Sequence, residues 1–518
     1  MDTCDLLICV ILLLFLYLYF RFKDLYSYFD QNGVPFVKPV PFFGNAKDWI
    51  LMRRPLPIIY YEVYTKLKSH RFGGMYIGTE KNILIRDPKL IKNILVKDFS
   101  YFQDRPSGSG GSDLLDKSLL RMRGDEWKNL RIKLTSTFTS GKMKLMFPLV
   151  RACAENLHQV LKDLSNKQED FDVKDVCSRY TIDVIGSCVF GLEINSLHNP
   201  DSVFRKMGNK IFEISFVQIL GALMPPPLQK IVKLFGNDRE INEFFAELVQ
   251  KTVKYREENN VSRGDFLDLL INLKNETDSQ KSNDHQTRED LEKFISQIGN
   301  HTKSNVDMTV ELMTAQCFLF FGAGFETSSS TLSFMLLELA RNPHIQDKLR
   351  NEIRTVLENN NNELTYETIK QMKYLDMVID ETLRKYPTTG RIIRICGKPY
   401  EIPDSKYVIP EGTTVIVSLR GLHYDTEYYE KPDEFYPEHF SEQAKAKRPH
   451  YTFLPFGDGP RSCMGERFGK MQIKIGAVNL LRDFSYSLSS KVKLPVEHLP
   501  GIGLMNIKGG IWLKCHKL

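Results

Sequence analysis

The run FGDGPRSCMGERFG, residues 456–469, constrains this chain more than any other stretch. Its one cysteine, Cys463, lies among glycines, a proline and an arginine. Gly457 and Gly459 permit backbone angles that other residues resist, and Pro460 lacks an N–H donor and stiffens the turn. A predicted helix follows at once, and a helix N-terminus favours the negative charge of a thiolate. The run therefore predicts a rigid loop that presents one anionic sulfur ligand to a metal.

The same run matches the pattern F-G-x-G-x-R-x-C-x-G at every specified position. These positions are Phe456, Gly457, Gly459, Arg461, Cys463 and Gly465. On these residues the chain resembles the haem-ligand loop of the cytochromes P450. The resemblance implies that Cys463 is the axial thiolate of haem b, whose electron donation favours cleavage of the O–O bond of O2. A buried, inert cysteine is the alternative.

A second motif, residues 323–327 (AGFET), interrupts a long apolar helical stretch with an acid beside a hydroxyl. Gly322 and Gly324 remove side chains where a flat ligand could approach, and they weaken the predicted helix. The motif matches the P450 pattern A-G-x-[DE]-T. By resemblance, Thr327 organises bound dioxygen and its proton-delivering waters, and Glu326 relays protons. A stray glutamate on an amphipathic helix is the alternative.

Glu381 and Arg384 are spaced i, i+3 in YLDMVIDETLRKYP, so a helix would allow a charge-assisted contact between them. By resemblance this pair is structural and supports the cysteine loop. A third partner usually comes from a P-x-x-F-x-P-E-R-F stretch, which here reads PDEFYPEHF, residues 432–440. His439 stands where arginine is commonest, and the charge of a histidine varies near neutral pH.

Carboxylates on the edge of a haem need cationic or donor partners. Trp127 and Arg131 are spaced i, i+4 on a predicted helix. By resemblance the residues that hold the cofactor are Trp127, Arg131, Arg394, Arg461, Phe456 and, as a further candidate, Arg105. For Arg131 alone, a surface charge is the alternative.

The resemblance also indicates substrate-pocket residues, each of which is equally well a core residue. They are Phe212, Phe216, Phe318, Ala323, Ile392, Ile393 and Leu504. Arg391 is unusual, because the matching segment of the family is commonly apolar. It could face a haem propionate, solvent or an anionic group of a substrate.

Residues 6–20 carry no charge, and Arg21 and Lys23 follow. This stretch is short for a membrane span but sufficient with snorkelling of the flanking side chains. Residues 1–23 are therefore predicted to be an uncleaved signal anchor, with the remainder facing the cytosol. A cleaved signal peptide is the alternative, but no small-residue cleavage site follows. The resemblance implies the endoplasmic reticulum membrane and contact with its lipid.

Three prolines in residues 24–45 predict a stiff, extended hinge. Residues 46–518 show neither a linker nor an internal repeat, which predicts one catalytic domain. A hairpin pattern at 73–87 precedes a long helical region, and short strand patterns return after residue 391. We expect a mainly α fold with small β-sheets, the cytochrome P450 fold.

The net charge of +6 is too small to argue for a nucleic-acid partner. Basic residues cluster at 117–144. They form either a solvated helix face or a docking surface for an acidic redox partner. Nine cysteines without a CxxC pair predict mostly free thiols and give no support for zinc. No dinucleotide fingerprint occurs in a βαβ context. Electrons from NADPH are therefore expected to arrive through a separate cytochrome P450 reductase, with cytochrome b5 as another candidate donor.

The resemblance extends from the N-terminus to the closing GGIWLK and is strongest to the insect microsomal, xenobiotic-metabolising branch. It implies a haem-thiolate monooxygenase that inserts one atom of O2 into lipophilic molecules such as plant allelochemicals and insecticides. Oxidation of an endogenous hormone-like lipid is an alternative. A non-catalytic haem protein that sequesters ligands and a reductase-independent isomerase of peroxides are two others. Neither of these last two needs the acid–alcohol pair.

Overall fold

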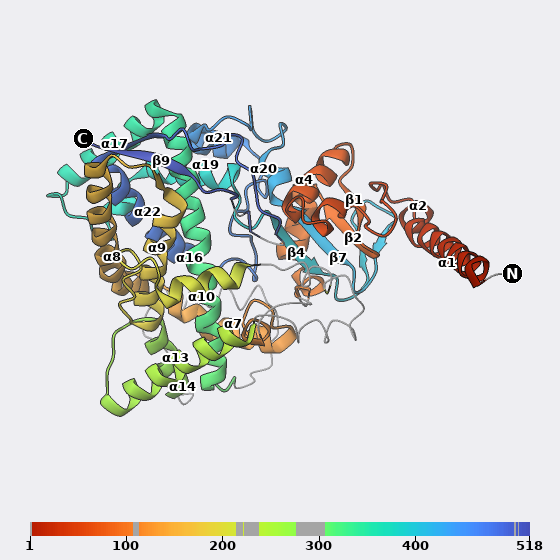
Figure 1. Cartoon of the computed structure of the whole chain (residues 1–518), viewed down its shortest axis with the longest axis horizontal. Helices are drawn as coiled ribbons and strands as arrows, with labels where there is room; N and C mark the ends of the chain where they lie inside the picture. The colour runs from red at the N-terminus through yellow and green to blue at the C-terminus, as the bar shows by residue number, and fades with distance from the viewer. Residues whose placement is uncertain are drawn as a thin grey trace.

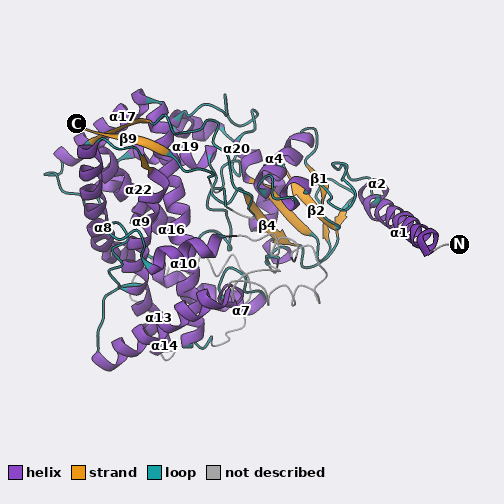
Figure 2. Cartoon of the chain, viewed as in Figure 1, coloured by secondary structure: helices purple, strands orange, loops and turns teal. Residues whose placement is uncertain are grey.

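Helices dominate the computed structural model, which describes residues 3–106, 113–213, 221, 238–275, 306–501, 504–505 and 507–518 (Figure 2). The strands within these described residues form three small sheets. The predicted mainly helical fold with small sheets is therefore confirmed. The longer helices are α1 (Thr3–Tyr26), α4 (Leu56–Lys66), α7 (Gly124–Thr135), α8 (Ser140–Lys167), α9 (Val173–Ile185), α10 (Val203–Phe212), α13 (Asp238–Asn259), α14 (Phe266–Asn275), α16 (Val310–Arg341), α17 (Pro343–Glu358), α19 (Lys373–Lys385) and α22 (Glu466–Leu481).

Short helical segments connect these elements. They are α2 (Tyr28–Gln31), α3 (Lys47–Ile50), α5 (Pro88–Lys92), α6 (Asp113–Asp116), α18 (Thr368–Gln371), α20 (Leu419–His423), α21 (Glu442–Lys447), the π-helical turns η1 (Asn93–Lys97) and η4 (Gly186–Phe190), and the 3₁₀ turns η2 (Phe99–Tyr101), η3 (Ser136–Phe138) and η5 (Pro437–Phe440).

The largest sheet has the strand order β1-β2-β7-β4, in which β2 and β7 are parallel and the other two pairs are antiparallel. The predicted hairpin is present as β1 (Phe72–Ile77) and β2 (Glu80–Ile85). Strand β4 (Arg391–Ile395) pairs with β7 (Thr414–Ser418), so that Arg391 lies opposite Ser418. The other sheets are β3-β9-β8, from Phe171–Asp172, Trp512–Lys517 and Phe484–Leu488, and β5-β6, from Tyr400–Glu401 and Val408–Ile409.

Helix α16 is the central element of the helical part (Figure 1). Thr309 caps its N-terminus by accepting a hydrogen bond from the Leu312 N–H at 3.2 Å. Most of its residues are buried, including the polar run from Ser328 to Thr331, as expected for a helix with neighbours on all sides. It packs against α9, α13, α19 and α22.

The core has two parts. One hydrophobic cluster joins α8, α9, α16 and α22, and the other joins α4, β1, β2 and β7. Ile392 and Ile393 of β4 pack against the second cluster, whereas Phe456 and Met464 of the cysteine loop pack against the first. Strand β4 and the cysteine loop therefore belong to opposite parts of the core.

Helix α1 projects from the body of the molecule (Figure 1). Among the described residues, no helix is both long and apolar enough to cross a membrane, so the predicted anchor is not confirmed. The Pro-rich segment lies against the sheet, since Val37 N–H donates to the Gly74 carbonyl at 3.2 Å and Gly74 N–H to the Pro35 carbonyl at 2.8 Å.

Candidate active site

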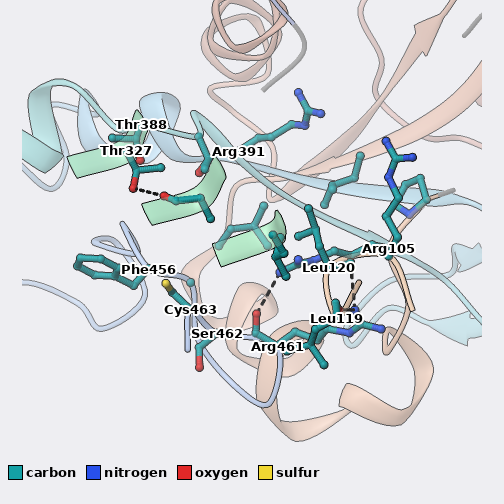
Figure 3. Close-up of a pocket in the computed structure, with 18 of the residues that line it drawn as sticks. Arg105, Leu119, Leu120, Thr327, Thr388, Arg391, Phe456, Arg461, Ser462 and Cys463 are labelled. Atoms are coloured by element: carbon teal, nitrogen blue, oxygen red, sulfur yellow. Dashed lines mark hydrogen bonds between the residues drawn. The ribbon is translucent and has the colours of Figure 1, made fainter. Parts of the chain in front are cut away.

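A cavity of about 1460 Å³ lies between the two parts of the core. Its wall includes Cys463 and Phe456 from the cysteine loop, Thr327 from α16, and Ile392 and Ile393 from β4. Figure 3 shows the sulfur of Cys463 on the side of the cavity where Thr327 and Phe456 also lie. The structure thus brings the two sequence motifs to one cavity.

The cysteine loop has the backbone that its glycines permit. Gly457 and Gly459 both have φ of +72°, in the left-handed region. A Cβ atom on Gly459 would lie 2.0 Å from the Leu95 carbonyl oxygen, so no other residue fits there. The Cys463 N–H donates to the Phe456 carbonyl at 2.8 Å, which closes the loop directly before α22.

Cys463 is exposed to the cavity rather than to the outer surface, because protein surrounds its other sides. Burial raises the pKa of its thiol, while a hydrogen bond from the Gly465 backbone and the positive charge of Arg131 oppose that rise. The free thiol is therefore neutral. A metal ion deprotonates the thiol that coordinates it, so the loop fits a metal-bound thiolate.

Four arginines gather at the same cavity: Arg105, Arg131, Arg394 and Arg461. Burial lowers the pKa of Arg461 to about 9, and repulsion from Arg105 and Arg131 adds to this effect. Burial also lowers the pKa of Arg131 to about 10. The pKa of Arg394 lies well below its usual value because of burial and of repulsion from Arg105 and Arg461. Several cations that destabilise one another indicate a site for an anion.

These arginines also hold the cysteine loop in place. The Arg461 guanidinium lies 4.1 Å from the centroid of the Trp127 ring, and its Nη2 donates to the Met122 carbonyl at 2.6 Å. Arg105 Nη2 donates to the Arg461 carbonyl at 3.1 Å. The Nε atoms of Arg394 and Arg461 are buried without a hydrogen-bond partner among the described residues. The carboxylates of a haem would supply acceptors and negative charge, so the residues fit that cofactor.

Helix α16 presents Thr327 to the cavity, and the Thr327 hydroxyl donates to the Ala323 carbonyl at 2.8 Å. Glu326 is buried and does not line the described cavity wall. Its Oε1 accepts a hydrogen bond from Lys174 Nζ of α9 at 2.8 Å, and the same Nζ donates to Ser329 Oγ at 2.7 Å. The acid and the alcohol therefore face different surroundings. No local sequence pattern points to Lys174, which is separated from Glu326 by 152 positions.

Gly324 of α16 lines the cavity and also allows close packing of the neighbouring helices. Helix α16 is continuous through the motif. A Cβ atom on Gly324 would lie 2.4 Å from Cδ1 of Ile185, so this glycine lets α9 pack closely. Gln472 of α22 donates from Nε2 to the Gly324 carbonyl at 2.9 Å. Gly324 is thus the point at which α9, α16 and α22 meet.

The predicted Glu381–Arg384 pair forms with both side chains fully buried. Arg384 Nε and Nη2 each donate to a Glu381 carboxylate oxygen at 2.8 Å, which makes the contact bidentate. His439 Nδ1 lies 3.2 Å from Glu381 Oε2, so the histidine occupies the third position of the network. Although burial opposes ionisation, the contacts with Arg384 and His439 lower the pKa of Glu381. The carboxylate is fixed in its charged form.

The predicted substrate-pocket residues fall into three groups. Phe318, Ala323, Ile392 and Ile393 line the cavity. Phe212 packs its ring 5.7 Å from that of Phe325 and, like Leu504, is not among the described residues of the cavity wall. Phe216 lies outside the described residues.

Known proteins resemble this chain over nearly all of its length. A sequence model of the family Cytochrome P450 matches residues 34–514. Probable cytochrome P450 6a23 of Drosophila melanogaster is 39% identical, over 99% of this chain and 99% of its own length. Cytochrome P450 6k1 of Blattella germanica is 39% identical, over 95% of this chain and 93% of its own length. The chain therefore belongs to the cytochrome P450 family.

Membership of this family defines an oxidoreductase with monooxygenase activity, which uses haem with a cysteine thiolate ligand and O2. It also implies a redox partner and lipophilic substrates. Both relatives are insect proteins, in agreement with the insect branch predicted from the sequence.

Proposed function

We propose that this protein oxidises lipophilic small molecules at a haem whose thiolate ligand is Cys463. The observation that carries the proposal is that Cys463, Thr327 and the four arginines converge on one cavity. When bound, haem supplies the reductive activation of O2. One oxygen atom enters the substrate, and the other leaves as water after two electrons and two protons are taken up. Plant allelochemicals and insecticides are the proposed substrate class.

The residues of the chain have separate tasks in this reaction. Cys463 holds the metal, and Arg105, Arg131, Arg394 and Arg461 bind the two carboxylates and so orient the cofactor. The hydroxyl of Thr327 can donate to a ligand in the cavity by exchanging its hydrogen bond to the Ala323 carbonyl. Glu326 exchanges protons with solvent through its contact with Lys174 and passes them toward Thr327.

A separate NADPH-dependent reductase is the proposed electron source. The basic residues at 117–144 are one candidate docking surface, but many of them have partners within the chain. Arg121 contacts Asp116 at 2.7 Å, Lys128 contacts Asp125 at 3.2 Å and Lys144 contacts Glu367 at 2.7 Å. The acidic partner is exposed in each of these pairs, and ion pairs near the surface are weak, at roughly 0–1 kcal/mol, so a partner protein could displace them.

Attachment to the endoplasmic reticulum membrane through residues 1–23 completes the proposal. Its support is the uncharged stretch at residues 6–20 and the exposure of Leu13, Tyr17 and Phe20 on α1. Arg21 and Lys23 would then place the catalytic domain on the cytosolic side.

The absorption spectrum of the reduced, carbon monoxide-bound protein tests the metal ligand. We expect the strongly red-shifted Soret band of a thiolate complex in the wild type and its loss in Cys463→Ser. A Cys463→Ser protein that binds haem and keeps this band would refute the assignment. Product formation from a lipophilic substrate only when NADPH and reductase are added separates a monooxygenase from a sequestering protein or an isomerase.

The role of Thr327 is tested by how tightly O2 consumption is coupled to product formation. Thr327→Ala is expected to keep the red-shifted band but to release more hydrogen peroxide per product, because proton delivery is less well controlled. A ratio of peroxide to product equal to that of the wild type would contradict this role.

A further inference from the structure

Arg391 lines the cavity at a place separate from the four arginines. It is the first residue of β4, three positions before Arg394. Successive side chains of a strand alternate between its two faces, so Arg391 and Arg394 lie on opposite faces of β4. Figure 3 shows the Arg391 side chain directed away from the sulfur of Cys463. Arg391 is therefore placed for a task other than holding the cofactor.

Arg391 offers hydrogen-bond donors in a part of the cavity whose walls are largely apolar. Its guanidinium carbon lies 5.5 Å from the centroid of the Tyr60 ring on α4, and its charge partly opposes the rise that burial causes in the pKa of Tyr60. Pro57 of α4 packs on Gly390, where a Cβ atom would lie 2.4 Å from Pro57 Cβ, so the helix is held against the start of β4. Leu56, Ile77 and Ile392 line the cavity as well.

Trp49 provides an independent observation on the same cavity. Its side chain is 3% exposed. It lines the cavity, and Leu56 and Tyr60 of the nearby helix α4 line it too. Its indole Nε1–H is buried and has no acceptor among the described residues. Since a buried donor without an acceptor is costly, an acceptor atom on a bound molecule would satisfy it.

The described wall also carries the acids Glu80 and Glu411, of which Glu80 acts on Tyr60. Glu80 is the first residue of β2 and is exposed.

We propose that Arg391, with Tyr60 and Trp49, binds the carboxylate of an amphiphilic substrate whose apolar body extends toward Cys463. The inference rests on the proposed function, since it names the substrate class of the same site. A guanidinium offers five N–H donors in a fork that matches a carboxylate, so it can contact Tyr60 and a ligand together. Anchoring of the acid group at Arg391 places the oxidised carbon at the far end of the substrate from the carboxylate.

Calorimetric titration of the purified, haem-loaded full chain tests this site with two probes, dodecanoate and methyl dodecanoate. A charged hydrogen-bonded contact is worth about tenfold to a hundredfold in affinity. We expect the wild type to bind dodecanoate more tightly than the ester. Arg391→Gln is expected to weaken dodecanoate binding at least about tenfold and ester binding less than about twofold. Equal loss for both probes, or no loss for dodecanoate, would overturn the proposal.

Arg420 offers a matched control. Its guanidinium carbon lies 5.6 Å from the ring centroid of Tyr61, the neighbour of Tyr60 on α4, but Arg420 is not among the described residues of the cavity wall. Arg420→Gln removes the same charge and should leave the preference for dodecanoate unchanged. If Arg420→Gln lost as much dodecanoate affinity as Arg391→Gln, net charge alone would explain the effect. That result would overturn the proposed carboxylate site.

Two milder variants guard against misfolding. Arg391→Lys keeps the charge and should retain part of the preference, whereas Trp49→Phe keeps the ring and should weaken dodecanoate binding alone. Retention of the full preference in both Arg391→Gln and Trp49→Phe would contradict the inference. Calorimetry does not depend on turnover or on the metal ligand. A wild type that prefers dodecanoate but lacks the red-shifted band would therefore refute the proposed function and leave the carboxylate site standing.

Discussion

Buried charges occur in two arrangements at the scale of single residues. Glu381 and Arg384 neutralise each other completely inside the protein. The arginines at the cavity instead repel one another and lower one another's pKa. The first arrangement stabilises the fold, and the second leaves a place for an anionic group.

Glu381→Gln should lower the free energy of unfolding by about 3–5 kcal/mol, because it leaves the buried guanidinium of Arg384 without its counter-ion. Urea unfolding followed by tryptophan fluorescence would measure the change. Glu438→Gln is the control, since Glu438 contacts Lys348 at 2.8 Å with side-chain exposures of 32% and 57%. Its cost is expected to be at most about 1 kcal/mol, and equal costs for the two variants would refute the prediction.

His423 makes stability depend on pH. It is fully buried, its Nδ1 lies 3.2 Å from the Arg384 carbonyl, and its Nε2 accepts from the Leu454 N–H at 3.3 Å. Burial and the charge of Arg384 lower its pKa from 6.5 to about 3. The unfolded chain therefore takes up a proton before the folded protein does. The stability that neutral His423 contributes is complete above pH 6.5 and is lost as the pH falls toward about 3.

Urea midpoints measured from about pH 7.5 to about 5.5 would detect this loss. His423→Asn keeps a donor for the Arg384 carbonyl but cannot titrate, so its stability should change less steeply with pH over the same range. An equally steep change in wild type and variant would show that other groups are responsible.

Two glycines of α16 that lie two positions apart, on different faces of the helix, give a contrast at the scale of elements. In Gly324→Ala, the new methyl group would lie 2.4 Å from Ile185 Cδ1, which should push α9 and α16 apart. The expected cost is about 1–3 kcal/mol. In Gly322→Ala the nearest atom is 3.6 Å away, so the higher helix propensity of alanine should stabilise by up to about 1 kcal/mol. Thermal unfolding of both variants compares them, and destabilisation by Gly322→Ala would contradict this account.

Features that depend on a few consecutive residues could be read from the sequence. The cysteine loop is of this kind, because its glycines fix a local backbone. The helix spacing of Glu381 and Arg384 likewise predicted their contact. The partner of Glu326 could not be predicted, since Lys174 reaches it only through the packing of α9 on α16. Trp49, Tyr60 and Arg391 line one cavity in the same way, from segments that share no local pattern.

At the scale of the whole molecule, α1 projects from the body and is separable from it (Figure 1). Deletion of residues 1–23 keeps Tyr26, whose hydroxyl donates to the Gly78 carbonyl at 3.1 Å and ties the chain to the hairpin of β1 and β2. The shortened protein should retain the haem spectrum of the full chain and should leave the membrane pellet after an alkaline carbonate wash. Continued retention in the pellet would place the membrane attachment elsewhere.

The cluster of Arg105, Arg131, Arg394 and Arg461 has a consequence for biogenesis. A newly made chain that has not yet acquired its tetrapyrrole must bring these like charges together against their repulsion. A ligand that binds only the folded form shifts the folding equilibrium toward it. With the proposed role of these arginines in binding the cofactor, supply of the prosthetic group should therefore set how much polypeptide survives cellular quality control.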